Sequence, residues 1–543
     1  MIKLKLYTLG VLLSFQFSIF GQSNGFEVIK NLELIDLIYL NLEKYYVDEP
    51  RTGAISKAGI DAMLNELDPY TVFYHEANIE DYRLMTTGQY GGVGALIRKI
   101  DDHVIIAEPY EGNPAQKAGL KAGDVIISID GRDMKDKSTE EVSNALKGTK
   151  GSSVLIVYDR PFEGKGTATV TRDEIKLPDV PYSGFVDEGI GYIKLNSFTQ
   201  TASNSVLEAF KELKSQGMDK LILDLRGNGG GLLIESVDIV NFFVPKDQLV
   251  VQTKARIKEE NREYKTRNKP VDLDIPIVVL IDEGSASASE IVSGSLQDLD
   301  RGVVVGRTSF GKGLVQRTLD LKYGAKMKLT IAKYYTPSGR CVQKLDYYHK
   351  NEGKVDEVPD SLLTIFKTKN GREVIDGRGI EPDVTIEGEK LGRLTGTLIG
   401  ENIIFNYATR FVNENKEIAS PEEFKLSDEA YKKFMIYVLE QEFDYTSRSE
   451  DKLKSVLETA KLEGYDQLIE DEYDALLKKV KGSKEKDLDL YKSQIVQLLQ
   501  NEIVSRYYYQ NGRVKNGFQS DDILHEAISI IKDEKRYKKI LNP

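Results

Sequence analysis

Three serines occur in a run of small residues that follows an apolar segment. The run is "IPIVVLIDEGSASASEI", in which Ser285, Ser287 and Ser289 lie between Asp282 and Glu290. A strand that enters a helix through such a turn exposes a hydroxyl at the end of a sheet and directs helix N-terminal amides toward it, as a nucleophile and its oxyanion require. A tightly packed helix start would need small residues as well. These residues alone do not separate the three hydroxyls, and Glu290 is expected to be a local structural partner.

A lysine between two glycines is the second feature with chemical potential. In "TSFGKGLVQ", Lys312 stands beside the apolar residues Phe310 and Leu314. Glycines let the backbone bend closely around a site, and loss of hydration lowers the pKa of a lysine until the neutral amine can serve as a base. The alternative interpretation is a solvated loop lysine.

A glycine-rich turn is the third feature. In "LILDLRGNGGG", an apolar strand runs into Gly227, Gly229, Gly230 and Gly231, and a helix is expected from about Leu232. Consecutive amides before a helix form a nest for an anion. A phosphate loop is the rival interpretation, but the GK[ST] ending of a P-loop is missing. The motif therefore favours an oxyanion site.

The three features lie in a segment that alternates strand and helix patterns. Residues 189–386 contain the strand-like runs "GIGYIKL", "KLILDLR", "IPIVVLI" and "GVVVG", with helices expected through Val206 to Leu213, from Leu232 and from Ala288. This alternation predicts an α/β core.

The flanking segments have other patterns. Residues 27–86 are predicted to be helical, and residues 88–173 to form a small antiparallel barrel with one helix, whose Ser138 and Glu141 fit a capping box. From about residue 389 the chain is rich in Lys, Glu, Leu and Tyr at helical spacing. That part is predicted to be an all-helical extension.

Composition excludes several functions. The formal net charge of -12 argues against a nucleic-acid partner. The four histidines lack metal-ligand spacing and no cofactor motif is present, so neither a metal nor a cofactor is expected. Cys341 is the only cysteine, which rules out an internal disulfide.

The first residues have the pattern of a secretory signal peptide. Lys3 and Lys5 precede an apolar run from Leu6 to Phe20, which is short for a membrane span. We therefore expect export, to the periplasm or cell envelope where an outer membrane exists and to the cell exterior otherwise. An uncleaved membrane anchor is the alternative.

The three motifs in this order resemble peptidase family S41, the C-terminal processing or tail-specific serine proteases. The resemblance implies a ClpP/crotonase-like ββα-spiral core and a Ser/Lys dyad, with Ser287 as nucleophile, Lys312 as base and Gln316 as its support. It also implies that the backbone amides of Gly231 and Ala288 bind the oxyanion. The match extends to "LDPYTVFY", where Tyr70 stands in place of the family's usual histidine, and to "GRGIEPDV".

The barrel-like segment resembles a PDZ domain. The strings "YGGVGALI" and "GNPAQKAGLKAGDVIISIDG" carry this resemblance. In a PDZ domain a peptide adds as a strand to the sheet edge, and loop amides capture its C-terminal carboxylate. The resemblance assigns that role to Gly91, Gly92, Val93 and Gly94. The alternative interpretation is that these glycines only shape the entry to a strand.

The sequence thus predicts an α/β peptidase core with an inserted PDZ domain, N-terminal helices and a C-terminal helical extension. The predicted domains are a signal peptide (1–21), an N-terminal helical segment (22–87), a PDZ domain (88–173), the peptidase core (174–388) and the extension (389–543). The expected function is that of an exported serine endopeptidase acting on proteins or peptides with accessible C-terminal tails. Three roles stay open for the extension: a homo-oligomer contact, an adaptor contact, or a cover over the cleft. The rivals are a catalytically silent or partner-activated PDZ scaffold and an acyl-CoA enzyme on a similar core.

Overall fold

The computed structural model describes residues 24–542 except 76–82, 85, 351–352, 389–390, 444, 447 and 481–483. The predicted signal peptide lies outside the described residues. The chain divides into two compact units, one made of residues 1–76 and 318–329 and the other of residues 77–317 and 330–543. Within the described part, no helix is both long enough and apolar enough to cross a membrane.

The first unit contains two helices and a short antiparallel pairing. Its elements are α2 (Asn24–Tyr45), α3 (Thr52–Asn65) and β1 (Val72–Tyr74). β1 pairs with the first residues of β18 (Lys326–Tyr335), in the register Val72 to Lys328. The prediction of helix over residues 27–86 is therefore wrong at β1. A three-residue strand whose partner comes so much later in the chain has no local pattern to reveal it.

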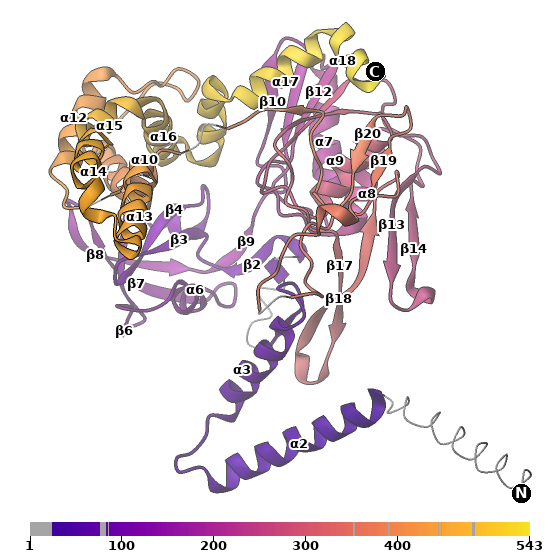
Figure 1. Ribbon diagram of the computed structural model, residues 1–543, viewed down its shortest axis with the longest axis horizontal. Coiled ribbons are helices and arrows are strands. Elements are labelled where there is room, and N and C mark those ends of the chain that lie inside the picture. Colours follow the sequence, from indigo (N-terminus) through magenta and orange to yellow (C-terminus); the bar gives the residue numbers. More distant parts are fainter. Residues whose placement is uncertain are drawn as a thin grey trace, which may run out of the picture. The chain divides into compact units, whose positions relative to one another are not determined.

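The second unit begins with the segment that resembles a PDZ domain (Figure 1). Its sheet has the order β3-β4-β5-β7-β8, with β6 on β5, and β2 pairs separately with β9. The predicted capping box is present: the Ser138 hydroxyl accepts from the Glu141 N–H, and the Glu141 carboxylate accepts from the Ser138 N–H. The strands are β2 (Gln89–Gly92), β3 (Ala95–Ile100), β4 (His103–Pro109), β5 (Val125–Ile129), β6 (Arg132–Asp133), β7 (Ser153–Arg160), β8 (Gly164–Thr171) and β9 (Asp173–Lys176), and the helices are α5 (Pro114–Lys117) and α6 (Thr139–Leu146).

The α/β core is built on a six-stranded sheet of order β10-β11-β12-β15-β16-β21. From β11 onward the neighbours run parallel. The sheet strands are β10 (Tyr182–Asp187), β11 (Ile190–Lys194), β12 (Lys220–Asp224), β15 (Ile277–Ile281), β16 (Val303–Gly306) and β21 (Val384–Thr385), and the helices between them are α7 (Ala202–Ser215), α8 (Leu233–Asn241) and α9 (Ala288–Asp298). Smaller sheets contain β13 (Leu249–Ala255), β14 (Arg262–Lys265), β17 (Leu314–Asp320), β18, β19 (Ile365–Lys367) and β20 (Glu373–Ile375).

Both faces of the core sheet are buried. In β15, Ile277, Val279 and Ile281 pack against α7, α8 and α9, whereas Val278 and Leu280 pack against the other side. A strand covered on both faces is apolar at every position rather than at alternate ones, as the run "IPIVVLI" shows. The carboxyl ends of the parallel strands therefore lie together at one edge.

The C-terminal extension is helical, as predicted, and its last two helices cover the second face of the core sheet (Figure 1). The side chains of Leu524, Ile530 and Ile531 are buried there with those of the sheet. No local pattern in the sequence predicts which surface these helices cover. The helices are α10 (Arg393–Gly400), α11 (Ile403–Glu414), α12 (Asp428–Leu439), α13 (Arg448–Glu463), α14 (Asp466–Val480), α15 (Lys484–Leu490), α16 (Lys492–Gly517), α17 (Asp522–Lys532) and α18 (Glu534–Leu541).

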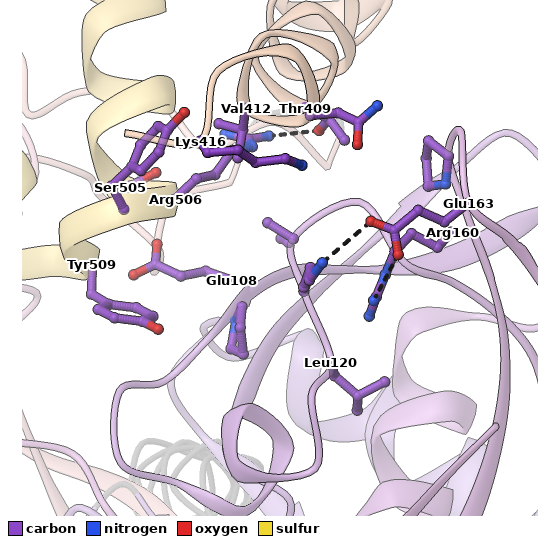
Figure 2. Close-up of a pocket in the computed structure, with 17 residues that line it drawn as sticks. Glu108, Leu120, Arg160, Glu163, Thr409, Val412, Lys416, Ser505, Arg506 and Tyr509 are labelled. Atoms are coloured by element: carbon purple, nitrogen blue, oxygen red, sulfur yellow. Dashed lines mark hydrogen bonds and ion pairs between the residues drawn. The ribbon is translucent and has the colours of Figure 1, made fainter. Parts of the chain in front are cut away.

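The extension also contacts the PDZ domain. Arg513 of α16 donates to Glu108 at 2.7 Å, and Gln116 donates to the Tyr509 hydroxyl at 2.5 Å. A cavity of about 340 Å³ is lined by Glu108 and Leu120 on the PDZ side and by residues of α11 and α16 on the other. Figure 2 shows these lining side chains. The α16 segment is thus tied to the PDZ domain by side-chain hydrogen bonds.

Candidate active site

A strained residue connects β15 to α9. The chain leaves the sheet at Ile281, and Ser287, directly before the helix, has φ 57° and ψ -111°. A non-glycine residue in this region costs about 1–3 kcal/mol and persists only where its surroundings impose it. The backbone is therefore held in a sharp turn at this serine.

Burial distinguishes the three serines that the sequence left open. Ser285 and Ser289 are fully buried. The Ser285 hydroxyl donates to the Leu225 carbonyl at 2.9 Å, and the Ser289 hydroxyl donates to the Asn228 carbonyl at 2.8 Å. Ser287 is partly exposed. Of the three, it alone has a side chain that a substrate can reach, which favours it as the nucleophile.

The buried carboxylate of Glu290 ties the serine turn to the lysine loop. Its Oε2 accepts from the Ser287 N–H at 2.7 Å and from the Lys312 N–H at 2.9 Å. Those two distances together, about 5.6 Å, set an upper limit on the separation of the two backbone nitrogens. Oε1 accepts from the Ser309 hydroxyl and the Gly311 N–H. Burial raises the pKa of Glu290, and these hydrogen bonds oppose that rise.

Close packing explains the glycines on both sides of Lys312. A Cβ on Gly311, whose φ is +85°, would lie 2.5 Å from the Cβ of Lys344, and a Cβ on Gly313 would lie 2.7 Å from the Gln343 nitrogen. The lysine loop is thereby fixed on both sides of a half-buried Lys312. Gln316 lies on β17, and its side-chain amide donates to the Thr330 hydroxyl at 3.1 Å.

The glycine-rich turn faces the serine turn. A Cβ on Gly230, whose φ is +97°, would lie 2.8 Å from the Ser287 Cβ and 3.0 Å from the Ala288 nitrogen. The Gly230 carbonyl accepts from Phe198, and the Gly230 N–H donates to the Asn228 side chain. Among the described residues, neither the Gly231 nor the Ala288 amide has a hydrogen-bond acceptor. Both amides are therefore available to an oxyanion.

The predicted peptide-binding residues lie directly before the first strand of the PDZ sheet. Gly91 and Gly92 belong to β2 and pair with β9, whereas Val93 and Gly94 connect β2 to β3. β3 is an edge strand of the sheet in the described part of the chain, and α6 contacts it. The Gly91 carbonyl accepts from Gly148, which follows α6, at 3.1 Å. The four residues therefore lie directly before β3 and, through Gly91, beside the end of α6.

Two features of the site were missed in the sequence. The first is the set of hydrogen bonds from the lysine loop to the Glu290 carboxylate, which join two segments that are separate in the chain. The side chain of Arg226, directly before the glycine turn, binds Asp521 of the C-terminal extension. The capping residue Asp521 is visible in the sequence, but nothing local connects it to Arg226.

Comparisons with known proteins agree with this architecture. Family models match at residues 189–347 (peptidase family S41), 105–160 (PDZ domain) and 394–531 (probable PDZ-protease, C-terminal helical domain). An α/β core of this kind joined to a PDZ domain and a helical domain defines a PDZ-containing serine peptidase.

Curated relatives assign the family. A probable CtpA-like serine protease of Staphylococcus aureus is 30% identical over 80% of this chain and 78% of the relative. A carboxy-terminal-processing protease of Bartonella bacilliformis is 33% identical over 63% of this chain and 80% of the relative. The solved photosystem II D1 C-terminal processing protease has 30% identity over 68% of this chain and 89% of that chain, with a TM-score of 0.37. The chain belongs to peptidase family S41.

Proposed function

We propose that this protein is an exported endopeptidase that binds protein C-terminal tails through its PDZ domain and cleaves them with a Ser/Lys dyad. The link through Glu290 carries the proposal, because one carboxylate oxygen holds the backbones of both Ser287 and Lys312. The relatives named for C-terminal processing support the substrate class. The lysine-rich start and the apolar run of residues 6–20 support export.

The chemistry is acyl transfer. Neutral Lys312 removes the hydroxyl proton of Ser287 as its oxygen attacks the peptide carbonyl, and the amides of Gly231 and Ala288 bind the oxyanion. The lysine returns the proton to the departing amine, and water then hydrolyses the acyl-enzyme. An ordinary lysine has a pKa of about 10.4 and is almost wholly protonated at neutral pH. The neutral fraction of the amine, which acts as the base, grows as pH rises, so activity should rise from neutral to mildly alkaline pH.

The PDZ domain supplies the substrate tail. Val93 and Gly94 precede an edge strand, so an added peptide strand on β3 would bring its terminal carboxylate to this loop. Holding the tail near the core raises its local concentration at Ser287. Gln316 supports the lysine loop from β17.

Intact-mass analysis of an unfolded protein with an apolar C-terminus tests the proposal. The mature enzyme, Ser287→Ala and Lys312→Ala are compared in buffer that contains a chelator. Fragments with the unmutated enzyme alone are expected. Binding of the tail without cleavage by any of the three would show a scaffold instead, and equal cleavage by Lys312→Ala would remove the lysine from the mechanism.

A further inference from the structure

Arg226 joins the glycine turn to the C-terminal extension. Its guanidinium makes a two-pronged contact with Asp521, from Nη1 to Oδ1 at 2.8 Å and from Nη2 to Oδ2 at 2.7 Å. Its other edge donates to Asp224. The Arg226 and Asp521 side chains are only 16% and 18% exposed. Paired, planar contacts of this kind are stronger than neutral hydrogen bonds and fix geometry.

The backbone of Arg226 is held at both ends. Its N–H donates to Asp224 at 2.8 Å, and its carbonyl accepts from the Lys194 ammonium at 2.6 Å. Burial alone would raise the pKa of Asp224, but the charges of Arg226 and Lys194 hold that pKa well below its usual range. Because Gly227 follows directly, the path of the glycine turn begins from this anchored residue.

α17 reaches from the carboxyl ends of the parallel strands to the opposite end of the core sheet. Asp521 caps the start of this helix by accepting from the Leu524 N–H, and it meets the edge where the parallel strands end. Lys532, at the other end of α17, pairs with Asp187 beside the start of β11. One end of the helix therefore meets the strand ends that carry Ser287, and the other end meets the opposite ends of the strands.

We propose that Asp521 is a positioning residue for the peptidase site. It fixes the Arg226 guanidinium and thereby holds residues 227–231 in the path that presents the Gly231 amide beside Ser287. A segment about 300 residues away in sequence, in the C-terminal extension, thus completes the site. The inference rests on the proposed function in one respect, namely that the Gly231 amide binds the oxyanion.

The test uses the full mature chain with Asp521→Asn. An asparagine retains the shape and the helix-capping oxygen but removes the charge that Arg226 binds. The matched control is Lys532→Ala, which removes the contact of α17 at the opposite end of the sheet. On a cleaved peptide, Asp521→Asn should lower kcat by about 10- to 100-fold with KM changed by less than about twofold, because a small displacement of an oxyanion donor acts on the transition state. Lys532→Ala should retain the wild-type kcat.

A second measurement does not depend on activity. Amide hydrogen exchange is recorded over residues 227–231 in a Ser287→Ala background. Faster exchange there with Asp521→Asn, and not with Lys532→Ala, supports the proposal even if the chain cleaves no peptide. Unchanged exchange together with an unchanged kcat overturns it. An equal increase in both variants, spread over the whole sheet, also overturns it, because the extension would then act only by covering the core.

Discussion

Replacement of Glu290 by glutamine tests whether one buried carboxylate aligns the serine and lysine segments. The carboxylate has two pairs of donors, Ser309 and Gly311 on one oxygen and Ser287 and Lys312 on the other. An amide has a single oxygen, so one pair of donors would face an NH₂ group that cannot accept. Each buried donor left without an acceptor costs about 1–3 kcal/mol, and removal of the buried charge offsets a part.

The expected result is a loss of about 2–4 kcal/mol in the free energy of unfolding and of at least about 100-fold in kcat, because misalignment of a dyad by about 1 Å is that costly. Urea unfolding at pH 8 and peptide cleavage are the assays. Glu283→Gln is the control, since Glu283 lies in the same connection with a side chain that is 66% exposed. A Glu290→Gln variant with wild-type kcat and stability would refute the reasoning.

Other outcomes follow from the same geometry. Gly230→Ala should lower kcat by about 100-fold, because its Cβ would lie 2.8 Å from the Ser287 Cβ, whereas Gly229→Ala, whose Cβ meets nothing within 4 Å, should cleave normally; equal kcat values would contradict this. Lys312→Met should abolish single-turnover acylation at every pH between 6 and 9, and residual acylation with a wild-type pH profile would exclude the lysine as base. Because burial raises the native pKa of Glu290, folded protein keeps a proton that unfolded protein has lost just above pH 4.5. The stability advantage of wild type over Glu290→Gln should therefore shrink as pH rises from that value through the native pKa, and urea titrations in which it grows would contradict the assignment.

Local patterns predicted the elements that form the site. The apolar run before the serines is β15, and the helix expected from Ala288 is α9. A strand buried on both faces and a helix that starts after small residues each give a pattern in residues that are adjacent in the chain. The sequence alone was therefore sufficient to predict these two elements. The PDZ domain was equally visible, because its turns and its capping box at Ser138 involve residues close in the chain.

Long-range contacts were not predictable in the same way. β1 depends on Lys326 to Lys328, and the cover of the second sheet face depends on Leu524 and its neighbours. The helical spacing of the extension correctly predicted helices such as α17, but such a spacing does not show which surface a helix covers. Residue type alone does not separate Ser287 from its neighbouring serines, and the family resemblance selected it. Burial and the backbone angles add a difference between the three serines that the sequence does not carry.

The site is therefore assembled from local elements and long-range anchors that perform different tasks. The strand ends bring Ser287 and the glycine turn to one edge, which any parallel sheet of this order would do. Glu290 and Asp521 then hold the loops at that edge through charged hydrogen bonds. Loops without such anchors have few buried contacts of their own and open at low free-energy cost. The long-range carboxylates thus hold the loops in place, and for that reason we expect substitutions at these two acidic residues to lower kcat.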